Sequence, residues 1–242
     1  MSPRTVSDVQ ADIARLARPR MPVPATSPAV LQAWRFELES WRAATPDGDT
    51  RYEALLAEWD TLEAEAKKHR ELEAWGERAG IPQRTLRAAL SAREEAPILL
   101  TREWLATSKT WLVLMGGVGT GKSVAAAWAL LQSRPKRCMW ETAVGLAARA
   151  GGFDGQTHAL RLKGCDVLVV DDLGVEHSSE FGRSVLAEVL LHRHEEGLST
   201  VLTTNLSGAA FRERVGERLA DRIRGDCATR AFGGDSLRGG GK

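Results

Sequence analysis

One octapeptide constrains the fold of this chain more than any other feature. Residues 116–123 read GGVGTGKS and match the pattern GxxxxGK[ST] at every fixed position. The apolar segment WLVLMGG runs into this loop, and the alanine-rich segment KSVAAAWALLQS completes and follows it. A glycine loop between a buried strand and a helix is typical of proteins that bind nucleoside triphosphates. The loop therefore predicts an α/β fold with a phosphate site where this strand ends.

The loop supplies the groups that a triphosphate and its magnesium ion need. Glycines let backbone N–H groups approach the phosphates, and the following helix directs its positive N-terminus toward them. Lys122 is expected to reach the β- and γ-phosphates, and the Ser123 hydroxyl to complete the Mg²⁺ shell. The loop residues expected to bind the nucleotide are Gly116, Gly117, Val118, Gly119, Thr120, Gly121, Lys122, Ser123 and Val124.

Polar side chains end two further apolar segments. Asp171 and Asp172 end CDVLVVDD, and Asn205 follows STVLTT. Helical segments lie between these expected strands, which predicts a parallel sheet with ligands at the carboxyl ends of its strands. Asp171 is therefore expected to hold Mg²⁺ through water, and Asp172 to orient or deprotonate the attacking water. Asn205 can bridge the γ-phosphate and that water, or else cap a helix or form a turn.

The composition argues against several other classes of protein. Of 242 residues, 43% are hydrophobic and 27% are charged, which is ordinary for a soluble protein. The net charge of +1 gives no global basic field for nucleic acid, although a local basic strip could hold a phosphate backbone. No apolar run is long enough to span a bilayer, and the N-terminus lacks the apolar stretch of a signal peptide. The cysteines lack CxxC spacing, which favours reduced thiols and a cytoplasmic location: Cys138, Cys165 and Cys227.

The sequence pattern divides the chain into three parts. Residues 1–75 are expected to form an N-terminal helical module that binds a partner, 76–110 a linker with a short helix or two, and 111–242 the ATPase domain. In the module, apolar residues recur at helical spacing on both sides of the turn-rich TPDGDT, which predicts a helical hairpin. They could pack within the hairpin or on the neighbouring domain, or leave one apolar face open for a partner's helix. The predicted seam is Leu31, Trp34, Leu38, Trp41, Tyr52, Leu55, Trp59, Leu62 and Ala66, and it could extend to His69.

An arginine-rich run, FRERVGERLADRIRGD, follows the last of these strands. It could be a solvated helix face balanced by Glu213, Glu217 and Asp221. Alternatively, one arginine could be presented to the nucleotide of a neighbouring subunit, where a planar cation stabilises transition-state charge. The spacing of the arginines alone does not choose between these interpretations.

The series of motifs resembles the DnaC/DnaI-type helicase loaders, and the IstB-type transposition helpers share much of it. GIPQRTL, WLVLMGGVGTGKS, LKGCDVLVVDDLG, HRHEEGLSTVLTTN, GERLADRIRG and GDSLR occur in the family's order across about residues 76–240. The resemblance implies a AAA+ P-loop three-layer α/β sandwich with a parallel central sheet, preceded here by the N-terminal α-helical module. About forty residues follow Asn205, too few for the helical lid of other AAA+ proteins.

The same resemblance implies roles for individual residues. The loop at 116–123 would be Walker A, Asp171 with Asp172 would be Walker B, and Asn205 would be sensor 1. Arg222 matches the arginine-finger position, with Arg218 as the alternative. Arg238, in GDSLR, matches a nucleotide-binding arginine similar to sensor 2.

We therefore expect a Mg²⁺-dependent ATPase that self-associates through its ATP sites and loads the replicative DNA helicase. It would bind the helicase through the N-terminal module and single-stranded DNA through an inserted helical region in TAVGLAARAGGFDGQTHALRLKG, with Arg149, Arg161 and Lys163 as candidate phosphate contacts. The alternative is a transposition helper that acts on duplex DNA with a transposase. A small-molecule kinase fits the aspartate pair, Asn205 and the arginine run poorly, and a GTPase is disfavoured because TTNL stands where NKxD would be expected.

Overall fold

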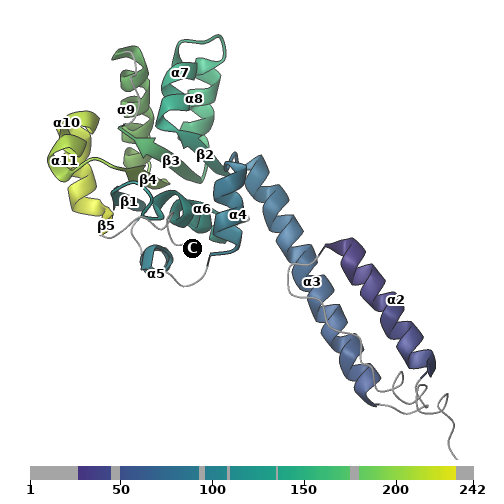
Figure 1. Cartoon of the computed structure of the whole chain (residues 1–242). Coiled ribbons are helices and arrows are strands. Elements are labelled where there is room, and N and C mark those ends of the chain that lie inside the picture. The colour runs from purple at the N-terminus through teal and green to yellow at the C-terminus, as the bar shows by residue number, and fades with distance from the viewer. Residues whose placement is uncertain are drawn as a thin grey trace, which may run out of the picture. The chain divides into compact units, whose positions relative to one another are not determined.

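The computed structural model divides into two compact units, Met1–Leu72 and Glu73–Lys242 (Figure 1). Helix α3 contributes residues to both units. No helix in the described part of the chain is long and apolar enough to cross a membrane. The structure describes residues 27–44, 50–92, 96–107, 110–134, 136–174 and 180–232.

The first unit contains a helical hairpin of α2 (Pro28–Ala44) and the first part of α3 (Thr50–Arg78). The buried residues of α2 recur every three or four positions, so they form one stripe that packs on Trp59 of α3. Trp59 Nε1 also donates a 3.2 Å hydrogen bond to the carbonyl oxygen of Leu31. Ala66 is buried and Leu62 is half-buried, whereas the side chains of Tyr52 and Leu55 lie outside the described part.

The second unit is built on a five-stranded sheet in the order β2-β3-β4-β1-β5. Its neighbouring strands all pair in parallel, as the sequence predicted. The inner strands β1 and β3 contain nearly continuous apolar runs because both of their faces are covered, whereas the inner strand β4 is rich in threonine. The strands are β1 (Trp111–Gly116), β2 (Cys138–Thr142), β3 (Val167–Leu173), β4 (Ser199–Thr204) and β5 (Ala228–Phe232).

Helices cover both faces of the sheet and give three layers (Figure 1). One face carries α4 (Gln83–Leu90), α5 (Ala96–Leu105) and α6 (Lys122–Gln132). The main core lies under the other face, where alternate strand residues such as Val113 and Leu202 pack on the opposite helices. Those helices are α7 (Ala143–Ala150), α8 (Gly155–Gly164), α9 (Glu180–Glu195), α10 (Gly208–Val215) and α11 (Glu217–Asp226). The arrangement is the predicted three-layer α/β fold with a parallel central sheet.

The segment 76–110 differs from the linker expected from the sequence. It contains α4 and α5, both of which pack on α6 and belong to the second unit. The cause is a set of apolar side chains, among them Leu86, Ala89 and Ile98, that are buried there. In addition, Trp140 N of β2 donates a 2.7 Å hydrogen bond to the carbonyl oxygen of Ala79. The segment is therefore part of the packed domain.

Candidate functional site

The glycine loop joins β1 to α6 in a backbone conformation that suits phosphate binding. Gly119 and Gly121 have φ angles of +84° and +86°, which residues with a Cβ rarely adopt. Gly121 is the N-cap of α6, so the first N–H groups of that helix lie at the loop. The described backbone thus offers a helix N-terminus and adjacent amide groups where β1 ends.

Lys122 is buried within this loop, with 5% of the residue exposed. Its Nζ donates hydrogen bonds of 2.9 Å and 2.6 Å to the carbonyl oxygens of Gly116 and Gly117. A buried ammonium group needs such partners, because its charge is otherwise costly to desolvate. The contacts keep the charge of Lys122 at the carboxyl end of β1, where the sequence predicted a phosphate site.

Asp171 of β3 lies against the start of α6. Ser123 Oγ donates a 2.8 Å hydrogen bond to Asp171 Oδ1, and Thr203 Oγ1 of β4 donates a 2.5 Å bond to the same oxygen. Burial raises the pKa of Asp171, an effect that the hydrogen bonds from Thr203 and Ser123 oppose. Sequence reasoning missed Thr203, although a threonine two residues before Asn205 at the end of a buried strand was a usable signal.

The donor set of Ser123 and Asp171 fits a magnesium ion. A hydroxyl and a carboxylate are hard oxygen ligands, and Mg²⁺ commonly binds through one or two carboxylates together with water and substrate phosphates. Among the described residues, no group of three or more His, Cys, Asp or Glu side chains could hold a metal ion. Phosphate oxygens and water are the usual further ligands of an ion held by such a pair.

Asp172 is turned out of the strand by a change in register. Val170 pairs with Leu202 but Leu173 pairs with Thr204, so β3 carries an irregularity at the two aspartates. Asp172 has a φ of +55°, is exposed, and donates its backbone N–H to Thr203 Oγ1 at 2.9 Å. Such a conformation is uncommon outside glycine and concentrates at functional sites. The irregularity buries Asp171 and leaves Asp172 free to face solvent.

Asn205 is the exposed residue that follows β4. Because β4 lies between β3 and β1, Asn205 is at the same edge of the sheet as Asp171 and the glycine loop. The N-cap of α10 is Ser207, so Asn205 is not the cap of the next helix. The structure thus removes the helix-cap interpretation of this asparagine.

Arg222 is not brought to the glycine loop of its own chain. Its Nη1 donates a 2.8 Å hydrogen bond to Glu195 Oε1, and this bond is the main cause of the lowered pKa of Glu195. Arg218 Nη2 lies 3.7 Å from the same oxygen. Glu195 ends α9 just before β4 begins at Ser199, which sets the pair at the amino edge of the sheet. A six-residue strand separates the two edges by roughly 20 Å.

The candidate DNA-contacting residues on α7 and α8 differ in exposure and in ion pairing. Arg149 Nη1 lies 2.6 Å from Glu141 Oε2, although 59% of the arginine side chain stays exposed. Lys163 is mostly buried and pairs with Glu188 at 2.6 Å. Arg161 is exposed and has no ion pair with any described residue. Arg238 lies outside the described residues.

Sequence reasoning also missed an exposed aromatic side chain between these helices. Phe153 follows α7 in the turn that leads into α8 and is fully exposed. A phenylalanine in the short run GGFDG was the available signal, because the flanking glycines and aspartate predict a turn at the surface.

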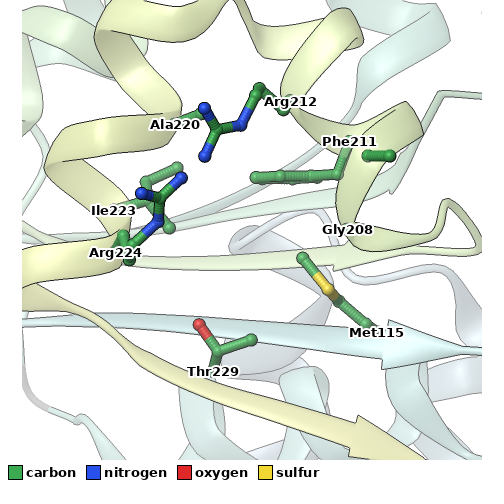
Figure 2. Close-up of a pocket in the computed structure, with 9 residues that line it drawn as sticks. Met115, Gly208, Phe211, Arg212, Ala220, Ile223, Arg224 and Thr229 are labelled. Atoms are coloured by element: carbon green, nitrogen blue, oxygen red, sulfur yellow. The ribbon is translucent and has the colours of Figure 1, made fainter.

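A separate hollow of about 350 Å³ opens beside the site, beneath α10 and α11 (Figure 2). Its apolar part includes Met115, Phe211 and Ile223, and the guanidinium groups of Arg212 and Arg224 lie on α10 and α11. Both guanidinium groups approach Asp221, at 3.9 Å and 3.5 Å. None of the predicted phosphate, metal or catalytic residues lines this hollow.

Comparisons with known proteins agree with this geometry. The model of the family described as IstB-like ATP binding protein matches residues 97–240. The replicative helicase loader DnaC of Buchnera aphidicola subsp. Acyrthosiphon pisum (strain APS) is 26% identical over 136 residues, 52% of this chain and 55% of the relative. The chain thus spans about half the length of this curated relative.

Solved structures show the same fold at low sequence identity. The crystal structure of the DnaC helicase loader matches with a TM-score of 0.54 and 22% identity, covering 63% of this chain and 100% of that one. The crystal structure of DnaI matches with a TM-score of 0.52 and 24% identity, covering 63% of this chain and 94% of that one.

Proposed function

This chain belongs to the IstB-like ATP binding protein family, and we propose on that basis that it is a Mg²⁺-dependent ATPase that loads the replicative DNA helicase onto single-stranded DNA in the cytoplasm. The observation that carries the proposal is the contact of Ser123 with Asp171 at the glycine loop. It joins the two oxygen ligands that a magnesium–triphosphate site needs.

The glycine loop and the residues at the ends of β3 and β4 have different roles in ATP hydrolysis. Backbone N–H groups at 116–121 hold the phosphates, and Lys122 exchanges its carbonyl partners for β- and γ-phosphate oxygens. Ser123 and Asp171 would hold magnesium, which would supply positive charge to neutralise the phosphate oxygens. Asp172 orients or deprotonates the attacking water, and Asn205 positions that water next to the γ-phosphate.

Arg222 acts on the nucleotide of a neighbouring subunit in this proposal. Its position at the amino edge of the sheet supports this, because it cannot serve a phosphate at the opposite edge of its own domain. Glu195 holds the guanidinium group on a surface that a second copy can approach, with 29% of the Arg222 side chain exposed. ATP would thereby link subunits, since each site would need an arginine from the next.

The α7–α8 region provides the contact with single-stranded DNA. Phe153 presents a fully exposed ring, and base–aromatic stacking is a sequence-tolerant way to hold single strands. Arg161 and Arg149 expose guanidinium groups on the two helices beside it, and these can contact phosphates. Single strands fit this combination better than duplex because their bases can leave the stack.

The α2–α3 hairpin provides the docking surface for the helicase. Phe36 and Val30 of α2 remain 72% and 48% exposed, whereas the tryptophans of the same helix are buried in the seam. An apolar residue outside the seam suits a partner's apolar groove or helix. The transposition helper remains the second candidate, because the description of the matching family, IstB-like ATP binding protein, refers to IstB.

Binding of labelled single- and double-stranded DNA, with and without a non-hydrolysable ATP analogue, tests the proposal. Lys122→Ala is the inactive variant, and Lys136→Ala, which changes an exposed lysine, is its control. Nucleotide-dependent preference for single strands supports the loader, whereas preference for duplex with cooperative assembly supports the transposition helper. ATP turnover and assembly that survive in Lys122→Ala contradict both.

A further inference from the structure

A buried carboxylate joins three elements at the carboxyl end of β2. Glu141 is 5% exposed, and its Oε2 lies 2.6 Å from Arg149 Nη1 of α7 and 2.6 Å from His158 Nε2 of α8. A carboxylate accepts hydrogen bonds, and His158 Nε2 can donate one to it in the tautomer that carries its proton there. Oε1 accepts a 3.1 Å bond from the backbone N–H of Thr142. Both oxygens of Glu141 are thus occupied by polar partners.

The chain around Glu141 is fitted to this carboxylate. A Cβ added to Gly145 would lie 2.5 Å from Glu141 Oε1 and 2.8 Å from Thr142 Oγ1, closer than these atoms can approach. A glycine at this position therefore lets the first turn of α7 approach the carboxylate. Thr142 Oγ1 also caps α7 by accepting a 2.9 Å bond from Gly145 N. The start of α7 is consequently fixed to the last two residues of β2.

That strand end adjoins the residue that holds the magnesium ion in the proposed site. Thr142 pairs with Asp171, and Glu141 pairs with Val170, across the β2–β3 ladder. A displacement of α7 and α8 relative to β2 would therefore act directly beside Asp171. Lys163 and Glu188 give α8 a second ion pair, but Glu188 is 66% exposed and lies on α9, away from this ladder.

We propose that Glu141 is a positioning residue that clamps α7 and α8 to β2 and links them to the nucleotide site. The clamp holds the helices through Arg149 and His158, and the ladder carries their position to Asp171. DNA on α7–α8 and a magnesium–nucleotide complex at Asp171 then strengthen each other's binding. The clamp stands on the contacts alone, whereas the coupling to DNA rests on the proposed function.

Amide hydrogen exchange of α7 and α8 tests the clamp without DNA. Glu141→Gln removes the charge with little change in size, and exchange over 143–150 and 155–164 should become roughly tenfold to a hundredfold faster, since bonds to a charged group are lost. Glu188→Gln, which also frees a cation of α8, should leave α7 at the wild-type rate. Unchanged exchange in Glu141→Gln would overturn the clamp.

A second variant guards against misfolding of Glu141→Gln. His158→Ala removes one arm of the clamp and leaves Arg149 on Glu141, and it adds no volume at a side chain that is only 18% exposed. Exchange should rise in α8 while α7 keeps the wild-type rate. An equal rise in both helices, or in neither, contradicts the assigned contacts.

Coupling is measured as the ratio of Kd for a labelled single strand without and with the ATP analogue. In Glu141→Gln this ratio should fall toward one while the affinity for the analogue is retained, and in Glu188→Gln it should match the wild type. A ratio that Glu141→Gln leaves unchanged would overturn the coupling. If the wild type itself binds no single strand, the proposed function fails, and the exchange experiment still decides the clamp.

Discussion

Ser123 Oγ donates a 2.8 Å hydrogen bond to Oδ1 of Asp171, a residue 48 positions away in the chain. The contact joins the loop after β1 to the end of β3, although β4 lies between these two strands in the sheet. It is possible because α6 begins above the carboxyl edge, where the ends of all these parallel strands meet. The same contact defines the position of magnesium in the proposed function.

Asp171→Asn should lower kcat for ATP hydrolysis by roughly a hundredfold to a thousandfold, while ATP binding is retained. The amide keeps the shape of the side chain but loses the charge that would attract magnesium, and loss of one preorganised electrostatic group typically has an effect of this size. Steady-state hydrolysis at saturating Mg²⁺ measures it. Asp166→Asn is the control, because that carboxylate is bound to exposed Arg137 at the opposite end of β3. Equal losses in both variants would contradict the role of Asp171.

Thr203→Val should lower kcat by roughly tenfold, with little change in KM for ATP. The hydroxyl donates to Asp171 and accepts from Asp172 N, so its loss frees both aspartates from β4. Thr203→Ser keeps the hydroxyl and should restore most of the rate. If the serine variant is as slow as valine, packing rather than hydrogen bonding accounts for the effect.

Arg222→Ala and Asp171→Asn should each hydrolyse ATP far more slowly than the wild type, yet regain part of the ATPase activity when mixed. Where the two variants meet, the Arg222→Ala subunit supplies an intact magnesium site and the Asp171→Asn subunit supplies an intact Arg222. Activity is then regained only if the arginine acts between subunits. Activity is measured as the two variants are titrated against each other. Arg224→Ala, a change on the same helix at a residue paired with Asp221, should stay active throughout. Mixtures that never exceed the separate variants would contradict action between subunits.

Gly182→Ala should destabilise the second unit by about 1–3 kcal/mol. A Cβ at this position of α9 would lie 2.9 Å from Ala147 Cβ and 3.0 Å from its Cα on α7, so the two helices would have to separate. The midpoint of urea unfolding measures the change. Gly164→Ala is the control, because a Cβ there meets nothing within 4 Å. Equal midpoints for wild type and Gly182→Ala would show that α7 and α9 can move apart freely.

Phe36→Ala should weaken capture of the replicative helicase by the full chain without shifting its unfolding midpoint. The ring is 72% exposed and contributes little to the seam, so its loss removes partner contact rather than core packing. Trp59→Ala is the structural counterpart, and it should destabilise the hairpin by about 3–5 kcal/mol. Retention of helicase by Phe36→Ala at wild-type affinity would exclude this part of α2 from docking.

Local sequence determined the phosphate loop and the parallel sheet. Glycines at 119 and 121 permit the positive φ angles of the loop, and the apolar run that ends in Asp171 is typical of a strand buried on both faces. The meeting of Ser123 with Asp171 follows from these features, because parallel strands bring their carboxyl ends to one edge. The stripe of α2 that packs on Trp59 likewise follows from helical spacing.

Tertiary structure decided the features that depend on register and on partners distant in sequence. The irregularity in β3 separates the roles of Asp171 and Asp172, and no local pattern encodes where β3 slips against β4. Glu195 fixes Arg222 at the far edge of the sheet through a contact between residues 27 positions apart, which the arginine spacing did not indicate. Helices α4 and α5, in the segment 76–110, pack on α6. The expected linker is therefore part of the domain. In each case the favourable contact is with a residue distant in sequence, and only the folded chain brings the two residues together.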